Sequence, residues 1–170
     1  MKIIKYTIKI ILATTILFSI SCNIEDGNKS RTLEQDLMEL NEFILKKESE
    51  GYNVDTTSLG VYYILREEGD GPYPEPKDTC FIKYRSYLLN GSLIENSENI
   101  FPNGIWKFVH KEADMISGLK DGISLMNKGC QTDLIIPSHL AYGAKGTADI
   151  HPYNTLIYVI SMHDIKPPED

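Results

Sequence analysis

The stretch Asp114–Gly129, DMISGLKDGISLMNKG, decides the fold. Four apolar residues in it recur at helical spacing and form one stripe, namely Ile116, Leu119, Ile123 and Met126. Gly129 stands where a helix usually ends, at a left-handed position that a residue without Cβ adopts cheaply. A short helix among β-like runs must bury its stripe on a sheet. The stretch therefore predicts a helix that fills a curved sheet, with a pocket where the two meet.

Short β-like runs lie on both sides of this helix. In chain order they are 61–65, 80–89, 92–97, 104–110, 131–137 and 155–165. Between the second and third runs, Asn90-Gly91 predicts a type I′ hairpin, whose two central residues both have positive φ. Strands joined by a hairpin, with one late helix, predict an α+β domain. We expect an antiparallel curved sheet of five to six strands wrapped around one short helix, preceded by an N-terminal helical leader.

The first 22 residues match a secretory signal, with early lysines and an apolar core at 10–20. The core is too short for a convincing membrane span. Ser21-Cys22 resembles a bacterial lipobox, which predicts a lipid on Cys22. The alternative is an ordinary signal peptide with an incidental cysteine. The lipoprotein interpretation places the chain in the cell envelope, lipid-anchored on the periplasmic or surface face of an outer membrane, with residues 23–32 as a polar tether.

A helical leader is expected over 33–59. Thr32 and Gln35 form a capping-box pattern, and an apolar stripe follows, which predicts a helix from Leu33 to Glu50 that stops at Gly51. This helix could pack on the main domain, mediate dimerisation or act as a stalk, and we favour packing.

Composition excludes several function classes. Apolar residues make up 42% and charged residues 24%, which suffices for a globular core. The net charge of −7, without a long basic run, argues against nucleic-acid binding. The four histidines are scattered, and neither a phosphate loop nor a nucleophile elbow is present. Cys80 and Cys130 could pair outside the cytoplasm, but buried free thiols are the favoured interpretation. What remains is a cluster of apolar and aromatic residues, typical of a site that binds by shape.

The run ISGLKDGISLMNKGCQTDLIIPSHLAYGAKG, followed by IHPYNTLIY, closely resembles the C-terminal half of FKBP-type peptidyl-prolyl isomerases. Its matching residues are Ile116, Gly118, Leu119, Asp121-Gly122, Met126, Gly129, Pro137 and Ala141-Tyr142-Gly143. The resemblance covers about Gly60 to Ile165. It implies an isomerase domain over 60–166, with 167–170 as a tail, and a helical leader like those of membrane-anchored bacterial members.

The resemblance also implies the site. Tyr142 matches a hydroxyl donor to the substrate carbonyl, Tyr84 matches an aromatic wall position, and Glu95 stands where the family has an aspartate; these three are the implied catalytic residues. The implied substrate-binding residues are Ile94, Trp106, Met115, Ile116, Leu119, Ile150 and Tyr158. Among these, Leu119 takes the pocket floor, where many members have tryptophan. Judged without the family, Tyr84, Trp106 and Tyr158 would be ordinary strand or core residues.

The implied activity is cis–trans isomerisation of Xaa-Pro bonds in exported proteins, whose proline-containing segments would be the partners. It needs no metal or cofactor, because an apolar pocket disfavours the planar, polarised amide relative to the twisted one. Three departures from the family pattern motivate an alternative: Glu95 replaces an aspartate, Ile94 an aromatic residue and Leu119 a tryptophan. The alternative is a weakly catalytic or non-catalytic lipoprotein that binds peptides.

Overall fold

The structure is a computed structural model that describes residues 31–168. The predicted signal segment and Cys22 lie outside the described residues. In chain order the elements are α2 (Leu33–Ser49), β1 (Asp55–Thr56), β2 (Tyr62–Glu67), β3 (Thr79–Leu88), β4 (Leu93–Asn96), α3 (Ser97–Ile100), η1 (Pro102–Gly104), β5 (Trp106–Val109), α4 (Ser117–Ile123), β6 (Gln131–Ile136), η2 (Ser138–Leu140) and β7 (Leu156–Lys166).

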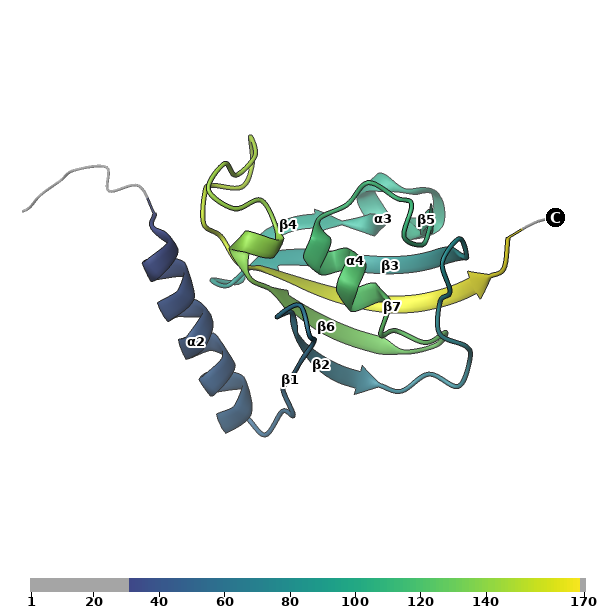
Figure 1. Ribbon diagram of the computed structural model, residues 1–170, viewed down its shortest axis with the longest axis horizontal. Coiled ribbons are helices and arrows are strands. Elements are labelled where there is room, and N and C mark those ends of the chain that lie inside the picture. The colour runs from purple at the N-terminus through teal and green to yellow at the C-terminus, as the bar shows by residue number, and fades with distance from the viewer. Residues whose placement is uncertain (1–30, 169–170) are drawn as a thin grey trace, which may run out of the picture.

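The strands form one antiparallel, curved sheet with α4 against one face and α2 beside the other (Figure 1). Its strand order is β1-β2-β6-β7-β3-β4, and β5 also pairs with β3. The predicted fold class is confirmed. The sheet has seven strands rather than five or six because Asp55 and Thr56 pair with Tyr63 and Tyr62. A two-residue strand is too short to show any apolar alternation, so the sequence pattern did not reveal β1.

The central helix is shorter than its apolar stripe predicted. α4 covers only Ser117–Ile123, and Ile116 before it is extended, with φ −57° and ψ 144°. After Ile123 the chain continues in tight turns, and Asn127 exchanges two hydrogen bonds with the backbone of Gly69. These contacts with a distant loop replace further helical turns. Gly129 does have positive φ, at 92°, as expected.

Two glycines let this short helix lie close to the sheet. A Cβ on Gly118 would collide with Ile136, and a Cβ on Gly122 would collide with Leu134. Both partners lie on β6 and are fully buried. The glycines therefore permit a close helix–sheet approach that buries Leu119 and its neighbours in the main core.

The predicted type I′ hairpin between β3 and β4 is wrong. Gly91 has φ 85°, but Asn90 is not among the residues with positive φ, which a type I′ turn would require. Instead Gly91 N–H donates to Leu88 O, and Leu88 N–H donates to Ser92 O. This pattern describes a three-residue loop whose last residue alone is left-handed. The Asn90 side chain accepts a bond from Ser92 N–H and so supports the longer loop.

α2 packs on the domain, as favoured from the sequence. Its start carries the predicted capping box, in which Thr32 and Gln35 each bond the other's backbone N–H. Its buried residues Leu40 and Ile44 form a second apolar cluster with Ile64 and Ile135 of the sheet. Within residues 31–168, no helix has both the length and the apolar character needed to cross a bilayer.

Cys80 and Cys130 are free and buried, in agreement with the favoured interpretation. Burial raises the pKa of Cys80 to about 12, and the nearby Asp78 charge acts in the same direction. Burial also raises the pKa of Cys130. At neutral pH both thiols are protonated and behave as small apolar core groups.

Candidate functional site

A cavity of about 230 Å³ opens where the start of α4 meets the sheet. Its lining comes from β3, β4, β5, β7, the residue between α3 and η1, the segment before α4 and its first turn, and the segment after η2. The lining residues are Tyr84, Glu95, Phe101, Trp106, Asp114, Met115, Ile116, Leu119, Tyr142 and Tyr158. The pocket predicted between helix and sheet therefore exists, and most of the residues that line it are aromatic or apolar.

Adjacent strands supply the aromatic wall. Tyr84 on β3 and Tyr158 on β7 have ring centroids 5.6 Å apart, and Trp106 on β5 lies 5.6 Å from Tyr84. Phe101 stacks on Trp106 at 5.9 Å, with the two planes inclined by only 9°. Ring contacts of this kind add to the stability that burial gives. They also pack the rings of the wall against one another.

The first turn of α4 supplies the floor. Leu119 is 2% exposed and belongs to the main core, whereas Met115 and Ile116 just before the helix are half-buried. Gly118 permits this placement, since any side chain there would push the helix away from β6. The floor is therefore a rigid part of the core.

The Tyr84 hydroxyl donates a hydrogen bond of 3.0 Å to Glu95 Oε2 across the β3–β4 pair. Burial raises the pKa of Tyr84, and the neighbouring Glu95 carboxylate raises it further. The phenol is therefore neutral at physiological pH, and the hydrogen bond holds the ring in one orientation.

Tyr142 stands at the mouth of the cavity, with 37% of its surface exposed. Two hydrogen bonds place it: Ser117 Oγ donates to Leu140 O at 3.2 Å, and Gly143 N–H donates to Ser138 O at 2.8 Å. The pKa of Tyr142 is raised by burial and by the charge of Glu95. Its hydroxyl is thus a neutral hydrogen-bond donor at the rim of an apolar cavity.

Ile94 and Ile150 are the two sequence-predicted site residues that the cavity lining does not include. Ile94 on β4 is half-buried against the main core, and Ile150 is a buried member of that core. The structure brings all the other predicted residues of the described chain to the cavity.

Phe101 and Asp114 line the cavity but were missed from the sequence. Asp114 directly precedes Met115, which the sequence had already placed in the site, and this adjacency was the available signal for Asp114. Phe101 follows α3, a single helical turn that Asn96 caps by accepting a bond from Glu98 N–H. The sequence signal for that turn was Asn96, a favoured N-cap residue, with the acidic Glu98 two positions later in the first turn of the helix.

The chemistry of the cavity is apolar recognition with a few polar groups. Among residues 31–168 no cluster of histidine, cysteine or carboxylate side chains could hold a metal ion. The aromatic wall and the leucine floor suit a compact apolar ring, and the Tyr142 hydroxyl suits a neighbouring carbonyl.

Comparison with known proteins identifies relatives of the chain. The sequence profile of the FKBP-type peptidyl-prolyl cis-trans isomerase family matches residues 71–163. The FKBP-type peptidyl-prolyl cis-trans isomerase FkpA of Escherichia coli (strain K12) is 32% identical over 114 residues, which are 67% of this chain and 41% of FkpA. A probable FkpA of Neisseria meningitidis serogroup B is 29% identical over 133 residues, 78% of this chain and 47% of the relative. The chain thus spans less than half the length of these relatives.

Solved structures show the same fold. The crystal structure of FkpA from Escherichia coli superposes with a TM-score of 0.65 at 29% identity, covering 79% of this chain and 63% of the FkpA chain in that crystal structure. A peptidyl-prolyl cis-trans isomerase from Pseudomonas syringae pv. tomato superposes with a TM-score of 0.67 at 23% identity, covering 81% of this chain and 98% of the other.

Proposed function

Because the chain belongs to the FKBP-type peptidyl-prolyl cis-trans isomerase family, we propose that it catalyses cis–trans isomerisation of Xaa-Pro bonds in exported proteins and so assists their folding. The observation that carries the proposal is the cavity between α4 and the sheet, which combines an aromatic wall, a leucine floor and a neutral tyrosine hydroxyl at its mouth.

The reaction suits such a cavity because no covalent bond breaks. The barrier of about 18–20 kcal/mol arises from amide resonance, which makes the planar amide polar. A twisted amide loses this polarisation and is therefore better tolerated in an apolar, water-poor pocket. An environment that favours the twisted form over the planar form lowers the barrier, which is differential binding of the transition state.

The proposed roles follow from position. The proline ring enters the cavity over Leu119, between Tyr84, Trp106 and Tyr158. The Tyr142 hydroxyl and the Ile116 backbone N–H each bind a carbonyl of the substrate. Glu95 orients Tyr84 through their hydrogen bond.

Ile94 and Ile150 are proposed to act from outside the cavity lining. Both pack into the main core beside it, so they set the position of β4 and of the loop after Tyr142.

A protease-coupled assay with a chromogenic Xaa-Pro tetrapeptide tests the proposal. The purified protein should accelerate the cis-to-trans step over the spontaneous rate in proportion to its concentration. The absence of acceleration by protein that circular dichroism shows to be folded would refute it.

A second function, peptide binding without turnover, has one observation in its favour. The floor residue Leu119 offers a smaller apolar contact than a larger aromatic residue would. Trp106 is the single tryptophan of the chain and lies in the wall, so its fluorescence reports occupancy of the cavity. Saturable quenching by an Xaa-Pro peptide without acceleration would favour binding over catalysis.

We also propose that residues 1–22 direct export, that Cys22 carries a lipid anchor, and that residues 23–32 tether the chain to the cell envelope. The polar stretch after Cys22 supports the proposal. Cys22→Ala should move the protein from the membrane fraction to the soluble fraction. Asn28→Ala, in the polar stretch away from Ser21-Cys22, serves as the control, and retention of the Cys22→Ala variant in the membrane fraction would contradict the anchor.

The proposed division of the chain keeps 33–59 as the helical leader, 60–166 as the isomerase domain and 167–170 as the tail. The match of the family profile to 71–163 supports the isomerase domain, whereas the pairing of β1 with β2 attaches the end of the leader to the same sheet.

A further inference from the structure

A buried carboxylate of the leader helix lies against the loop that carries Tyr142. Asp36, in the first turn of α2, is 0% exposed, and its Oδ1 accepts a hydrogen bond of 2.8 Å from Thr155 N–H. Arg31 lies 3.5 Å from the same oxygen. The other carboxylate oxygen has no hydrogen-bond partner within the described part of the chain. The other buried residues of this helix, Leu40 and Ile44, are apolar, so a carboxylate at Asp36 is the exception on the buried face.

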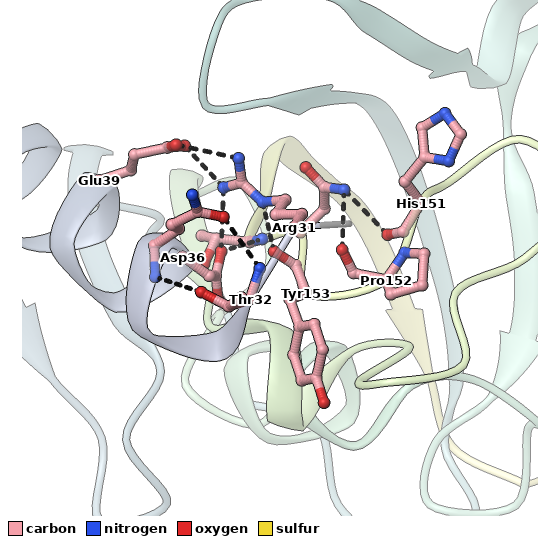
Figure 2. A network of polar contacts seen from close by, with 10 residues as sticks. Arg31, Thr32, Asp36, Glu39, His151, Pro152 and Tyr153 are labelled. Atoms are coloured by element: carbon pink, nitrogen blue, oxygen red, sulfur yellow. Dashed lines mark hydrogen bonds and ion pairs between the residues drawn. The ribbon is translucent and has the colours of Figure 1, made fainter. Parts of the chain in front are cut away.

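Arg31 adds a second contact at the same end of the loop, two residues before Thr155. Its Nε donates a hydrogen bond of 2.6 Å to Tyr153 O, while its two terminal nitrogens hold Glu39 at 3.0 and 2.6 Å. Figure 2 shows this arginine between the helix and the loop backbone. Tyr153 adopts the left-handed backbone conformation, with φ 54°, which is uncommon for a residue other than glycine. In this conformation its carbonyl oxygen points toward Arg31.

Hydrogen bonds within the loop connect the segment held by Asp36 and Arg31 to the segment that carries Tyr142. Tyr153 N–H donates a hydrogen bond of 2.8 Å to Gly143 O, which closes the base of the loop beside Tyr142. Toward the apex, Thr147 N–H donates to Ile150 O at 2.7 Å, and Thr147 Oγ1 accepts from Ile150 N–H at 3.0 Å. These bonds connect the base of the loop to its other end and brace its apex, and the start of α2 lies at its base (Figure 1).

We propose that Asp36 and Arg31 are positioning residues that hold the loop 141–155, and with it Tyr142, in the conformation that binds substrate. The physical reason is the cost of a buried charge. A buried carboxylate must be compensated by its partners for lost hydration, and on this proposal Asp36 contributes to one specific arrangement of the loop. Long loops without regular structure are typically functional, and Asp36 and Arg31 give this one an anchor outside the loop.

The proposal rests on the proposed function and predicts a particular kinetic pattern. If the loop is competent only a fraction of the time, substrate binds more weakly by that fraction, but bound substrate turns over normally. Asp36→Ala should therefore raise KM about tenfold and leave kcat within about twofold. A variant that merely unfolds in part would lower kcat and leave KM unchanged.

The experiment uses the full chain with the variants Asp36→Ala, Asp36→Asn, Arg31→Gln and Glu39→Gln. Asp36→Asn keeps an acceptor for Thr155 N–H and should restore KM to within about threefold of the unmodified protein. Arg31→Gln removes the bond to Tyr153 O and should raise KM as much as Asp36→Ala does. If Asp36→Ala does not fold, the KM of Arg31→Gln tests the proposal instead. Glu39→Gln alters only the exposed partner of Arg31 and should leave KM unchanged.

Two readouts do not depend on turnover. Amide hydrogen exchange at Gly143, Tyr153 and Thr155 should accelerate at least tenfold in Asp36→Ala, with Ile160 in β7 unchanged. The affinity for an Xaa-Pro peptide, followed by Trp106 fluorescence, should weaken about tenfold. Unchanged loop exchange or unchanged affinity would overturn the proposal. If the unmodified protein shows no isomerase activity, the proposed function fails, while exchange and affinity still decide the role of Asp36.

Discussion

The Tyr84 hydroxyl and the Glu95 carboxylate are joined by a hydrogen bond of 3.0 Å that crosses from β3 to β4 inside the cavity. Tyr84 is 7% exposed, so its hydroxyl depends on this one carboxylate for an acceptor within the protein. The antiparallel pairing of β3 with β4 thus places the Glu95 carboxylate where it orients an aromatic ring of the wall.

Glu95→Leu should therefore reduce both stability and activity. A buried hydroxyl that loses its acceptor costs about 1–3 kcal/mol, and a free Tyr84 ring no longer presents one face to substrate. Urea denaturation followed by Trp106 fluorescence measures the first effect, and kcat/KM the second. Glu95→Gln retains an acceptor oxygen and should stay within about threefold in kcat/KM. Glu98→Leu, at an exposed position on α3, is the control, and a Glu95→Leu variant as stable and active as this control would show that the bond has no role.

Tyr142→Phe should lower kcat/KM by about tenfold, because one hydrogen bond to a substrate carbonyl contributes on the order of 1 kcal/mol. The fold should be unaffected, since the hydroxyl lies at an exposed rim. Circular dichroism and steady-state kinetics together make the check. Tyr73→Phe, which removes a hydroxyl from an exposed tyrosine outside the cavity, is the matched control. Equal rates in the two variants would remove Tyr142 from the site.

Gly122→Ala should destabilise the protein by about 1–3 kcal/mol, even though alanine favours helices more than glycine. The added Cβ would collide with a methyl carbon of Leu134, which is fully buried, so the helix or the Leu134 side chain would have to shift. The midpoint of chemical denaturation measures the effect. Lys120→Ala places alanine in the same helix without that collision and should change stability little. A Gly122→Ala variant more stable than the unmodified protein would contradict the close helix–sheet approach.

His110 should make stability depend on pH. It is buried, and burial, assisted by the Lys111 charge, lowers its pKa below the usual value of 6.5. The unfolded chain therefore binds a proton that the folded chain does not, so the free energy of unfolding falls as the pH drops below about 6.5. The slope contributed by this one group cannot exceed about 1.4 kcal/mol per pH unit.

Thermal or urea denaturation between pH 7.5 and 5 checks this dependence. His110→Gln should flatten the pH profile relative to the unmodified protein, whereas His163→Gln, at an exposed position, should leave it unchanged. A profile that keeps its full slope in His110→Gln would assign the dependence to other groups.

The residues that line the cavity were largely predictable because they lie on elements with strong patterns. The helical stripe that contains Leu119 and the strand runs that contain Tyr84 and Tyr158 follow directly from periodicity, and the family resemblance brought them together. The extent of the helix was less predictable. Its stripe continues to Met126, but the side chain of Asn127 binds a distant loop and ends regular structure earlier.

Contacts across long sequence separations could not be predicted. Asp36 has the appearance of an ordinary polar residue in the first turn of a helix, yet its partner Thr155 is 119 positions away. The turn at Asn90 was misjudged because the Asn-Gly pair fits two loop lengths, and only the backbone φ of Asn90 separates them. Local patterns identify elements, whereas buried polar pairs are determined by tertiary structure.

The most direct test of the central claim is NMR exchange spectroscopy on an Xaa-Pro peptide, with and without a small amount of the protein. Spontaneous isomerisation takes tens to hundreds of seconds at 25 °C, so no exchange cross-peaks between cis and trans signals form within a mixing time of about one second. We predict strong cross-peaks in the presence of the protein and weaker ones with Tyr142→Phe. Their absence, with Trp106 fluorescence showing folded protein, would contradict catalysis at this cavity.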